Sequence, residues 1–513
     1  MTHALIKATT LWQLLLRRAL LTPTAIMVIE GRTQMRITFA QALDIAERLA
    51  AGFYERGIRS GTTVTWMLPT GLRAVITSLA LARLGALQNP IISLYGEREV
   101  RAILERNRSA YLLIADNDGR DYSGMARLLC EQLAHPPHVI VMGEDLPQGR
   151  PSSLPPPPVE GQSVRWVYYT SGTTSEPKGA CHTDETLMIG GRNLARAMGG
   201  CAADIGSIAF PIAHIGGAMY TCMVLASGMS MVLLDRFQAQ EAATVFRRYN
   251  VTLTGGSTAH YQALLAEQRR CPHKSLLPAL RLLSGGGAPK PPELYYQIRR
   301  EMGCSLTHNY GMTEVPLICA GVVTDTDEQL ANTEGVPVDD VELRIVGADG
   351  RLAGDDESGE VRLRGKGVFK GYTDPALTTA AFDNEGFFRT GDLALRRPDG
   401  RIVITGRLKD VIIRKGENIS AKEIEDLLFT HPKVAGVAVI GLPDEFRGER
   451  VCAVIELKRG VSALPFEEMV AFFETAQVMR QKIPEQLEIV EQLPRNDTLN
   501  KVLKHVLRER FSR

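Results

Sequence analysis

Residues 168–179 read YYTSGTTSEPKG, in which a loop rich in hydroxyl groups and glycine directly follows a strand-like run over residues 164–169. Backbone N–H groups in such a turn point toward an anion, and four Ser or Thr hydroxyls between positions 170 and 174 add further donors. Lys178 can supply a mobile positive charge. The loop therefore predicts a phosphate-binding site.

The loop is not a Walker A motif, GxxxxGK[ST], because Gly179 follows the lysine where that motif requires serine or threonine. A short loop of Ser, Thr and Gly is more often an exposed turn without a ligand. The length of this run, placed directly after a strand, favours the phosphate site over that alternative.

The sequence on both sides of this loop predicts a layered α/β fold. Between residues 40 and 145, and again up to about residue 330, helical patterns alternate with short strand-like runs, which is typical of parallel sheets covered by helices. A proline-rich stretch at 146–161 reads as an exposed connection. Residues 341–404 are strand-rich, with turns of Gly and Asp.

The pattern after Arg407 predicts a second, smaller α/β unit. We expect helices over residues 421–429 and 465–476, and strands over residues 434–441 and 450–458. We therefore divide the chain into domains of residues 1–407 and 408–513.

The composition of the 513 residues is that of an ordinary globular protein, with 44% hydrophobic residues, 23% charged residues and a net charge of +1. This balance offers no basic surface for nucleic acid. Eight cysteines lie far apart without a CxxC pair, which disfavours a disulfide framework or a zinc site and predicts reduced thiols in a cytoplasmic protein. No apolar run reaches the roughly 18 to 20 residues of a membrane span.

The loop at 168–179 resembles the phosphate-binding motif of the adenylate-forming, or AMP-binding, superfamily, in its acyl- and aryl-CoA synthetase branch. Further stretches resemble the other motifs of this superfamily in the same order along the chain: FPIAH at 210–214, SGGGAP at 284–289, NYGMTE at 309–314, TGDL at 390–393, GRLKD to KGENI at 406–419, and PRN with Lys501 at 494–501. The resemblance spans essentially the whole chain. It implies an α/β fold with a large N-terminal domain of layered α/β subdomains and a strand-rich subdomain, plus a small mobile α+β C-terminal domain.

The resemblance implies an ATP-dependent acid–thiol ligase. Such an enzyme activates a carboxylic acid as acyl-AMP with ATP and Mg²⁺, and then transfers the acyl group to coenzyme A as a co-substrate. Two alternative acceptors stay open, an amine and the phosphopantetheine of a carrier protein. A degenerate nucleotide-binding protein is a third alternative, and it predicts the loss of residues that are all present: Lys178, Glu314, Asp392 and Lys501. We expect the partners to be these small molecules and not nucleic acid. A homodimer stays open.

The implied catalytic residues would reduce charge repulsion, because an anionic carboxylate must approach the anionic α-phosphate of ATP. By resemblance, Glu314 binds Mg²⁺ and Thr313 hydrogen-bonds the α-phosphate. Lys501 bridges the carboxylate and the α-phosphate, and Lys178 adds a second positive charge. The implied ATP-binding residues are Thr170, Ser171, Gly172, Thr173, Thr174, Gly287, Ala288, Pro289, Asn309, Tyr310, Asp392 and Arg407. Among these, Tyr310 stacks on adenine and Asp392 accepts the ribose hydroxyls.

The acyl pocket is implied in the same way. Its residues are His214, Gly217, Gly285, Gly286, Gly311 and Met312. Residues 214–220 carry no acidic side chain that could pair with an α-ammonium group, which disfavours amino acids as substrates. We expect the glycines to leave space and Met312 to add apolar surface, as a hydrophobic aliphatic, alicyclic or aromatic acid requires. His214 is expected to line this pocket without acting as a base.

The segment at the domain boundary is implied to serve the second half-reaction. Lys409 occupies the hinge position, where a few backbone torsions rotate the C-terminal domain. One orientation presents Lys501, and the other presents Lys415, Gly416 and Glu417 to coenzyme A. Gly416 lacks a Cβ and lets the pantetheine arm pass close to the backbone.

Two positions depart from the usual motifs. Ser175 stands where the phosphate loop often has glycine, and Asn500 replaces the glycine that commonly precedes the C-terminal lysine. Asparagine is the residue that best replaces glycine in a left-handed conformation. We therefore keep Lys501 as the catalytic lysine.

Overall fold

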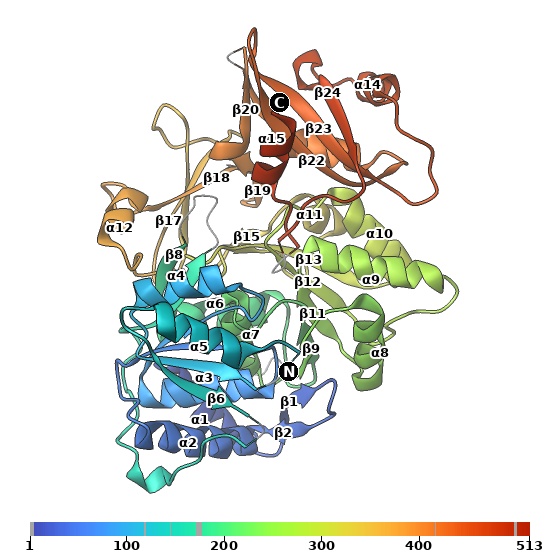
Figure 1. The fold of residues 1–513 in the computed structure, drawn as a ribbon. Coiled ribbons are helices and arrows are strands. Elements are labelled where there is room, and N and C mark those ends of the chain that lie inside the picture. Colours follow the sequence, from blue (N-terminus) through green and yellow to red (C-terminus); the bar gives the residue numbers. More distant parts are fainter. Residues whose placement is uncertain are drawn as a thin grey trace.

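The computed structural model describes residues 5–116, 119–143, 145–170, 177–415, 417–496 and 500–512. Four sheets and their helices form a large N-terminal body and a smaller C-terminal domain, which lies above that body in Figure 1. The predicted α/β fold with a large N-terminal and a small C-terminal domain is confirmed.

The first sheet has the strand order β6-β5-β3-β4-β7-β8 and is parallel except for β8. Its strands are β3 (Thr63–Met67), β4 (Leu87–Pro90), β5 (Tyr111–Ala115), β6 (His138–Met142), β7 (Val164–Thr170) and β8 (Lys178–Thr183). The helices of this part of the chain are α1 (Leu11–Leu21), α2 (Phe39–Glu55), α3 (Leu72–Leu84), α4 (Glu97–Asn107), α5 (Tyr122–Gln132) and α6 (Asp184–Ala197), with a 3₁₀ turn η1 (Pro151–Ser153). Because β7 and β8 are antiparallel neighbours, Thr170 lies opposite Lys178 and both ends of the predicted phosphate loop lie together.

The second sheet has the order β15-β14-β13-β12-β11-β9-β10-β1-β2 and is parallel from β13 to β1. Its strands are β1 (Ile26–Glu30), β2 (Arg36–Thr38), β9 (Ile205–Ile208), β10 (Ser230–Leu233), β11 (Leu253–Gly256), β12 (Leu282–Gly286), β13 (Ser305–Tyr310), β14 (Cys319–Ala320) and β15 (Val336–Pro337). The helices that alternate with them are α7 (Ile215–Ser227), α8 (Ala239–Tyr249), α9 (Thr258–Arg270), α10 (Pro292–Met302) and α11 (Asp327–Asn332). The carboxyl ends of β12 and β13 carry the predicted SGGGAP and NYGMTE motifs.

The third sheet is antiparallel, in the order β16-β17-β18-β19. It contains β16 (Glu342–Val346), β17 (Gly359–Arg364), β18 (Phe388–Arg396) and β19 (Ile402–Arg407), with helix α12 (Pro375–Ala381). A 3₁₀ turn η2 (Leu408–Asp410) then leads out of this sheet. The chain changes sheets between Arg407 and Val411.

The C-terminal sheet has the order β21-β20-β23-β22, with β24 parallel to β23. Its strands are β20 (Val411–Arg414), β21 (Glu417–Ser420), β22 (Val434–Asp444), β23 (Gly448–Leu457) and β24 (Gln486–Val490). The helices are α13 (Ala421–Phe429), α14 (Phe466–Thr475) and α15 (Lys504–Phe511), with a 3₁₀ turn η3 (Arg480–Lys482). Ser420 begins α13, because its Oγ accepts the Glu423 N–H and also donates to the Thr405 carbonyl of β19.

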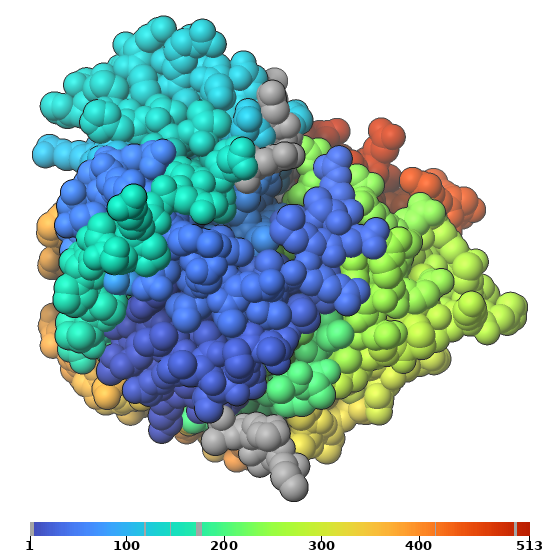
Figure 2. Space-filling model, turned by 90° about the horizontal axis from the view of Figure 1, so that it is seen from below, coloured from blue at the N-terminus to red at the C-terminus, as the bar shows by residue number. Residues whose placement is uncertain are grey.

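One hydrophobic core joins the two large sheets, since Trp66 on β3 and Met231 on β10 belong to the same buried cluster. The C-terminal domain has apolar clusters of its own. From below, the N-terminal segment (blue), the segment of α5 and β6 (cyan to teal) and the segment of α8 to α10 (green) cover most of the face, and the C-terminal domain (red) appears only at the rim (Figure 2). Within the described ranges, no helix combines the length and the apolar character needed to cross a bilayer.

Candidate active site

A cleft of about 1920 Å³ runs between the N-terminal body and the C-terminal domain. The predicted site residues that line it are Thr170, Lys178, His214, Gly285, Gly286, Gly287, Ala288, Pro289, Asn309, Tyr310, Gly311, Met312, Thr313, Glu314, Asp392, Arg407, Lys409 and Lys501. Ser171, Gly172, Thr173, Thr174 and Gly416 lie outside the described residues. Residues hundreds of positions apart in the chain thus share one cavity.

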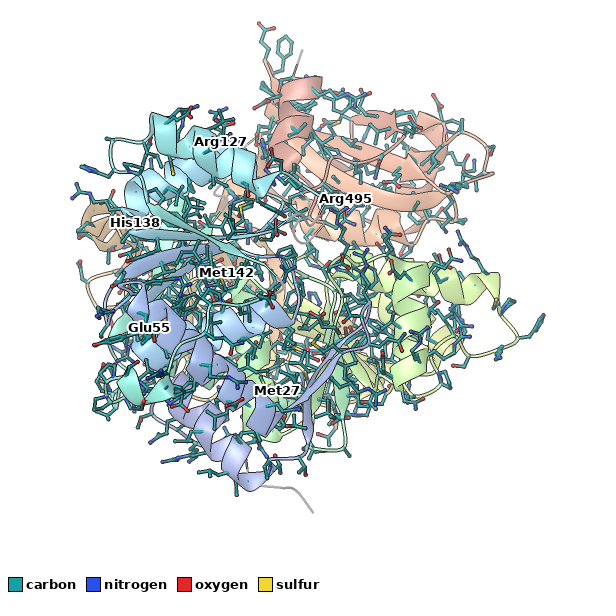
Figure 3. All side chains as sticks on the ribbon, turned by 60° about the horizontal axis from the view of Figure 1, so that its bottom comes forward. Met27, Glu55, Arg127, His138, Met142 and Arg495 are labelled. Carbon is teal, nitrogen blue, oxygen red and sulfur yellow. The ribbon has the colours of Figure 1, made fainter. Side chains whose placement is uncertain are left out.

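The cleft receives side chains from both domains. Arg495, which precedes the Lys501 segment, lines it from the C-terminal side, and Figure 3 shows this residue where the C-terminal domain meets the N-terminal body. On the N-terminal side, Lys178 begins β8, and its Nζ lies 5.6 Å from the centre of the Tyr372 ring. This arrangement places cations on opposite walls of one space.

Glu314 is the buried carboxylate of the site. The Tyr372 hydroxyl donates a hydrogen bond to Glu314 Oε1 over 2.6 Å. Burial raises the pKa of the Glu314 carboxyl, while Tyr372 and Lys178 oppose the rise. A buried carboxylate that faces a cleft and is hydrogen-bonded by the neutral Tyr372 hydroxyl is suited to a cation.

The donor set at Glu314 fits magnesium. The described residues contain no group of three or more His, Cys, Asp or Glu side chains that could hold a metal ion. Magnesium keeps several waters and needs only one or two protein carboxylates beside phosphate oxygens. Glu314 therefore fits the predicted role as a single carboxylate ligand.

Asp392 binds two other residues that line the cleft. Its Oδ2 accepts the Tyr310 hydroxyl over 2.7 Å, and its Oδ1 lies 2.7 Å from Arg407 Nε. The two charged residues face each other because β18 and β19 pair Asp392 with Arg407. Each carboxylate oxygen keeps a further lone pair, so Asp392 can still accept ribose hydroxyls.

Asn309 presents an unsatisfied acceptor next to the segment predicted to lie beneath adenine. Its Nδ2 donates to Ser284 Oγ over 2.9 Å, which turns Oδ1 away, and this buried oxygen has no hydrogen-bond partner among the described residues. Asn309 pairs in register with Gly286, directly before the 287–289 segment. A ligand with an amino group can satisfy this oxygen.

The acyl side of the cleft is apolar. His214 is the N-cap of α7, where its Nδ1 accepts the Gly216 N–H over 3.1 Å, and burial lowers its pKa to about 4. The ring is therefore neutral near pH 7, and it lines the cleft. The apolar side chains nearby include Ile92, Ile103, Leu194, Met198, Phe210, Met219 and Leu317.

The glycines have a structural cause that the sequence did not reveal. A Cβ on Gly285 would lie 1.9 Å from the Gly256 carbonyl oxygen, and one on Gly286 would lie 2.0 Å from that of Asn309. The close approach of neighbouring backbone therefore requires these glycines, whether or not they also leave room for a substrate.

Gly217 and Gly311 show the same cause. Their Cβ atoms would lie 2.2 Å and 2.4 Å from the carbonyl oxygens of Ile212 and Pro316, respectively. Gly217, moreover, is buried in α7 and does not line the cleft.

We expect Gly285→Ala to destabilise the fold rather than to reshape the pocket selectively. Since β11 and β12 cannot move apart without breaking the sheet, the substitution should cost about 3 kcal/mol. Thermal and urea unfolding measure this effect. Gly200→Ala is the control, because its Cβ would meet only atoms at 3.5 Å or beyond. Equal stability of the two variants would contradict the proposed reason.

Lys501 reaches the cleft from the C-terminal domain. Its backbone N–H donates to Asn496 Oδ1 over 2.9 Å, and Asn500 has φ 55°, the left-handed conformation expected at this position. Burial and the nearby Arg407 lower the pKa of Lys501 to about 8, against the attraction of Asp392. Lys501 therefore lies within electrostatic reach of the pair formed by Asp392 and Arg407.

Two further predicted residues do not line the cleft. Lys415 has φ 51° and donates its N–H to the Arg447 carbonyl, and Glu417 begins β21. Lys409, in contrast, lines the cleft from the turn between β19 and β20. In this structure Lys501 lines the cleft, whereas Lys415 and Glu417 do not.

Comparison with known proteins agrees with this geometry. The profile of the AMP-binding enzyme family matches residues 15–373, and that of the AMP-binding enzyme C-terminal domain matches residues 423–499. The chain belongs to the AMP-binding enzyme family. It is accordingly an adenylate-forming ligase that uses ATP and a carboxylic acid.

Several relatives of this AMP-binding enzyme differ in acceptor. This chain is 30% identical to the medium-chain fatty-acid–CoA ligase of Escherichia coli over 92% of its own length and 85% of that protein. It is 32% identical to a salicyl-AMP ligase / salicyl-S-ArCP synthetase of Mycobacterium tuberculosis over 89% of this chain and 82% of that protein. Among solved structures, ATP-bound MatB from Rhodopseudomonas palustris superposes with a TM-score of 0.87 at 25% identity, covering 98% of this chain and 99% of MatB.

Sequence reasoning missed two residues of the AMP-binding site. The Tyr372 hydroxyl donates to Glu314, and His182 Nε2 donates to the carbonyl of the preceding motif residue, Thr313, over 2.7 Å. Burial lowers the pKa of His182 to about 4, so the ring is neutral. Neither residue belongs to a motif, and each touches the site only through contacts distant in sequence.

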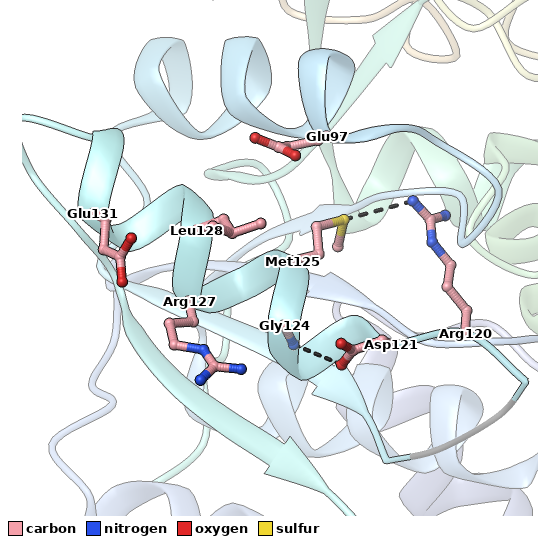
Figure 4. A pocket seen from close by; sticks show the side chains of 8 residues that line it. All are labelled: Glu97, Arg120, Asp121, Gly124, Met125, Arg127, Leu128 and Glu131. Atoms are coloured by element: carbon pink, nitrogen blue, oxygen red, sulfur yellow. Dashed lines mark hydrogen bonds between the residues drawn. The ribbon is translucent and has the colours of Figure 1, made fainter.

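A second, smaller hollow of about 550 Å³ lies between α4 and α5 (Figure 4). It contains none of the predicted site residues of this AMP-binding enzyme. Asp121 accepts the Gly124 N–H at the start of α5, and Arg120 donates to Met125 Sδ and to the Ser93 carbonyl. Asp121 and Arg120 thus already serve local structure.

Proposed function

We propose that this AMP-binding enzyme is an AMP-forming ligase that joins a hydrophobic monocarboxylic acid to coenzyme A. The observation that carries the proposal is the placement of Lys501 beside Asp392 and Arg407, in a cleft whose other end is apolar. A relative named as a fatty-acid–CoA ligase supports the choice of substrate class and acceptor.

In the first half-reaction the acid carboxylate attacks the α-phosphorus of ATP, which forms acyl-AMP and releases pyrophosphate. The Lys501 ammonium neutralises the charge that develops on the α-phosphate, and Asp392 holds the ribose in place. Glu314 would hold Mg²⁺, which supplies charge neutralisation at the phosphates when bound. The buried walls on the acyl side exclude water that would otherwise hydrolyse the mixed anhydride.

In the second half-reaction the thiolate of coenzyme A attacks the acyl carbonyl and AMP leaves. We propose that the C-terminal domain turns about Lys409, at a boundary between residues 407 and 408. This turn would withdraw Lys501 and bring Lys415, Gly416 and Glu417 toward the acyl-AMP. The change of sheets between Arg407 and Val411 supports this position of the hinge.

The charged residues on the acyl side of the cleft predict selectivity for acids with a single carboxylate. Among the described residues between 90 and 317 that line the cleft, only Lys178 and Glu314 carry a full charge. Burial also keeps His214 and His308 neutral, because it lowers the pKa of each. A second acidic group on the substrate would therefore be buried without a partner.

We expect the enzyme to prefer an apolar acid over a matched acid with a second, terminal carboxylate by about 100-fold in kcat/KM, since an unpaired buried charge is strongly disfavoured. Pyrophosphate release measures both substrates, with butanoate against succinate and octanoate against octanedioate as matched pairs. Equal use of both members of each pair would contradict the proposed substrate class.

The pKa of Lys501 predicts the pH dependence of adenylation. The ammonium form is the active one, so kcat/KM should fall about tenfold per pH unit as the pH rises beyond a Lys501 pKa of about 8. Pyrophosphate release between pH 6 and 10 measures this fall. Lys501→Arg keeps its charge over this range and should show a flatter profile at lower activity. A wild-type profile that stays level to pH 10 would contradict the role of Lys501.

The experiment that tests the function combines the purified protein, ATP and Mg²⁺ with a panel of acids, with and without coenzyme A. Many turnovers that require coenzyme A and yield a thioester by mass spectrometry would support the proposal. Pyrophosphate release that stalls near one equivalent with coenzyme A present would overturn coenzyme A as the acceptor. Hydroxylamine and carrier proteins would then be tested, as the relative named as a salicyl-S-ArCP synthetase suggests.

A further inference from the structure

Four charged side chains lie near the place where α13 of the C-terminal domain meets β19, next to the hydrogen bond from Ser420 Oγ to the Thr405 carbonyl. Lys290 and Glu334 belong to the N-terminal body and are only 4% and 7% exposed. Lys422 and Asp426 lie one turn apart on α13, where they form an ion pair. We call these four residues the interdomain cluster.

Each member on the N-terminal side is held by its own backbone contact. Lys290 Nζ donates to the Ala331 carbonyl, and Glu334 Oε2 accepts the Ile404 N–H over 2.8 Å. Neither contact neutralises a charge. Both groups therefore depend on charges nearby, and part of that charge comes from the other domain.

Acidic and basic side chains of the two domains interact across the domain boundary. Burial raises the pKa of Glu334, and Lys422 opposes this more strongly than Lys290 does. Burial alone would lower the pKa of Lys422, but Asp426 and Glu334 raise it. Lys422 is thus shared between an acid of its own helix and an acid of the other domain.

The interdomain cluster lies beside the predicted adenine site. Lys290 follows the segment 287–289 directly, and His308 precedes Asn309. Burial and the two lysines keep His308 uncharged by lowering its pKa. Glu334, His308, Lys422 and Asp426 all line the cleft that contains Lys501.

Helix α13 also fixes the position of Lys501. Helices α13 and α15 pack against the same strand, β22. Lys504 Nζ, three residues after Lys501, lies 2.7 Å from Glu425 Oε1 on α13. Docking of α13 on the N-terminal body therefore carries the Lys501 segment with it.

We propose that Lys422 is a positioning residue, which ties α13 to Glu334 and so favours the domain orientation that presents Lys501 for adenylation. The inference rests on the proposed function, because it needs two half-reactions with different orientations. A turn of the domain about Lys409 would remove Lys422 from Glu334 but leave its pair with Asp426 intact. The electrostatic attraction between Lys422 and Glu334 therefore stabilises one orientation over the other by its own free energy.

The test compares Lys422→Met with Lys433→Met. Methionine keeps the length and helix propensity of lysine at position 422. The control, Lys433, pairs with Glu468 over 2.6 Å wholly inside the C-terminal domain. We measure acyl-AMP formation by pyrophosphate release, and transfer to coenzyme A from chemically supplied acyl-AMP.

Lys422→Met should lower adenylation about tenfold, within the range typical of coupling between two states, and leave the transfer step unchanged or faster. Lys433→Met should leave the ratio of the two rates as in the wild type. An equal loss in both half-reactions for Lys422→Met would overturn the inference, because it would indicate a merely structural role.

A double-mutant cycle supplies the second measurement. Glu334→Gln keeps an oxygen for the Ile404 N–H but removes the charge. If Lys422 acts through Glu334, the double variant should lose no more adenylation activity than the more affected single variant. Additive losses would overturn the inference.

Failure of the proposed function would appear in the wild-type protein itself, as absent acyl-AMP or absent thioester. A wild type that forms acyl-AMP but passes none to coenzyme A would overturn the acceptor alone. The comparison of Lys422→Met with Lys433→Met in adenylation would then still decide the role of Lys422.

Discussion

Lys501→Ala should lower the rate of acyl-AMP formation by about 1000-fold, as expected when a group that stabilises developing charge in a buried site is removed. Lys501 lies within electrostatic reach of Asp392 and Arg407, and burial with Arg407 lowers its pKa. Alanine leaves that space without a mobile cation, so the approaching carboxylate and phosphate repel each other. Pyrophosphate release with acid, ATP and Mg²⁺ measures the loss.

The same variant should retain transfer to coenzyme A from supplied acyl-AMP, because Lys501 is withdrawn in that step. Gly416→Trp is the complementary variant, predicted from the sequence alone, and it should retain adenylation but lose transfer. Equal failure of both variants in both half-reactions would show that one domain orientation serves the whole reaction.

Glu314→Gln should lower adenylation by about 100-fold, because a bound metal ion supplies several kcal/mol of charge stabilisation. Glutamine still accepts the Tyr372 hydroxyl, so the local fold should persist. The Mg²⁺ concentration required for half-maximal rate should rise. Independently of activity, the Mg²⁺ concentration required for ATP to protect the protein against thermal unfolding should rise as well.

Tyr372→Phe is the matched control for Glu314→Gln. It removes one hydrogen bond but keeps the carboxylate, so adenylation should fall only about fivefold. A Glu314→Gln enzyme with the wild-type rate and an unchanged magnesium requirement would assign the ion to other ligands.

The sequence was sufficient to predict several elements of the C-terminal domain. The helix predicted over residues 421–429 is α13 with the same bounds, and the strand predicted over 434–441 lies within β22. These predictions succeeded because alternation of buried and exposed residues is a local property of the chain. Asp392, Glu314 and Lys501 were predicted as site residues because the runs around them resemble family motifs, and all three line one cleft.

Only the tertiary structure decided why the glycines are there. In sequence, Gly285 and Gly217 suggested space for a substrate, yet a Cβ at either position would collide with the carbonyl of another segment. Such a constraint depends on the distance between two backbones, and no periodicity encodes that distance. Tyr372 and His182 were not predicted for the same reason, because only folding brings them within hydrogen-bond distance of Glu314 and Thr313.

The interaction between the two domains is the feature that the sequence predicted least. Lys422 and Asp426 read as an ordinary helical ion pair, which is usually solvated and contributes little. Folding buries this pair at the cleft that Glu334 also lines, where Lys422 and Glu334 attract each other electrostatically. The motifs in the sequence thus predicted which residues line the cleft, whereas long-range packing determined which of them lie close together, because electrostatic interaction depends on separation in space rather than along the chain.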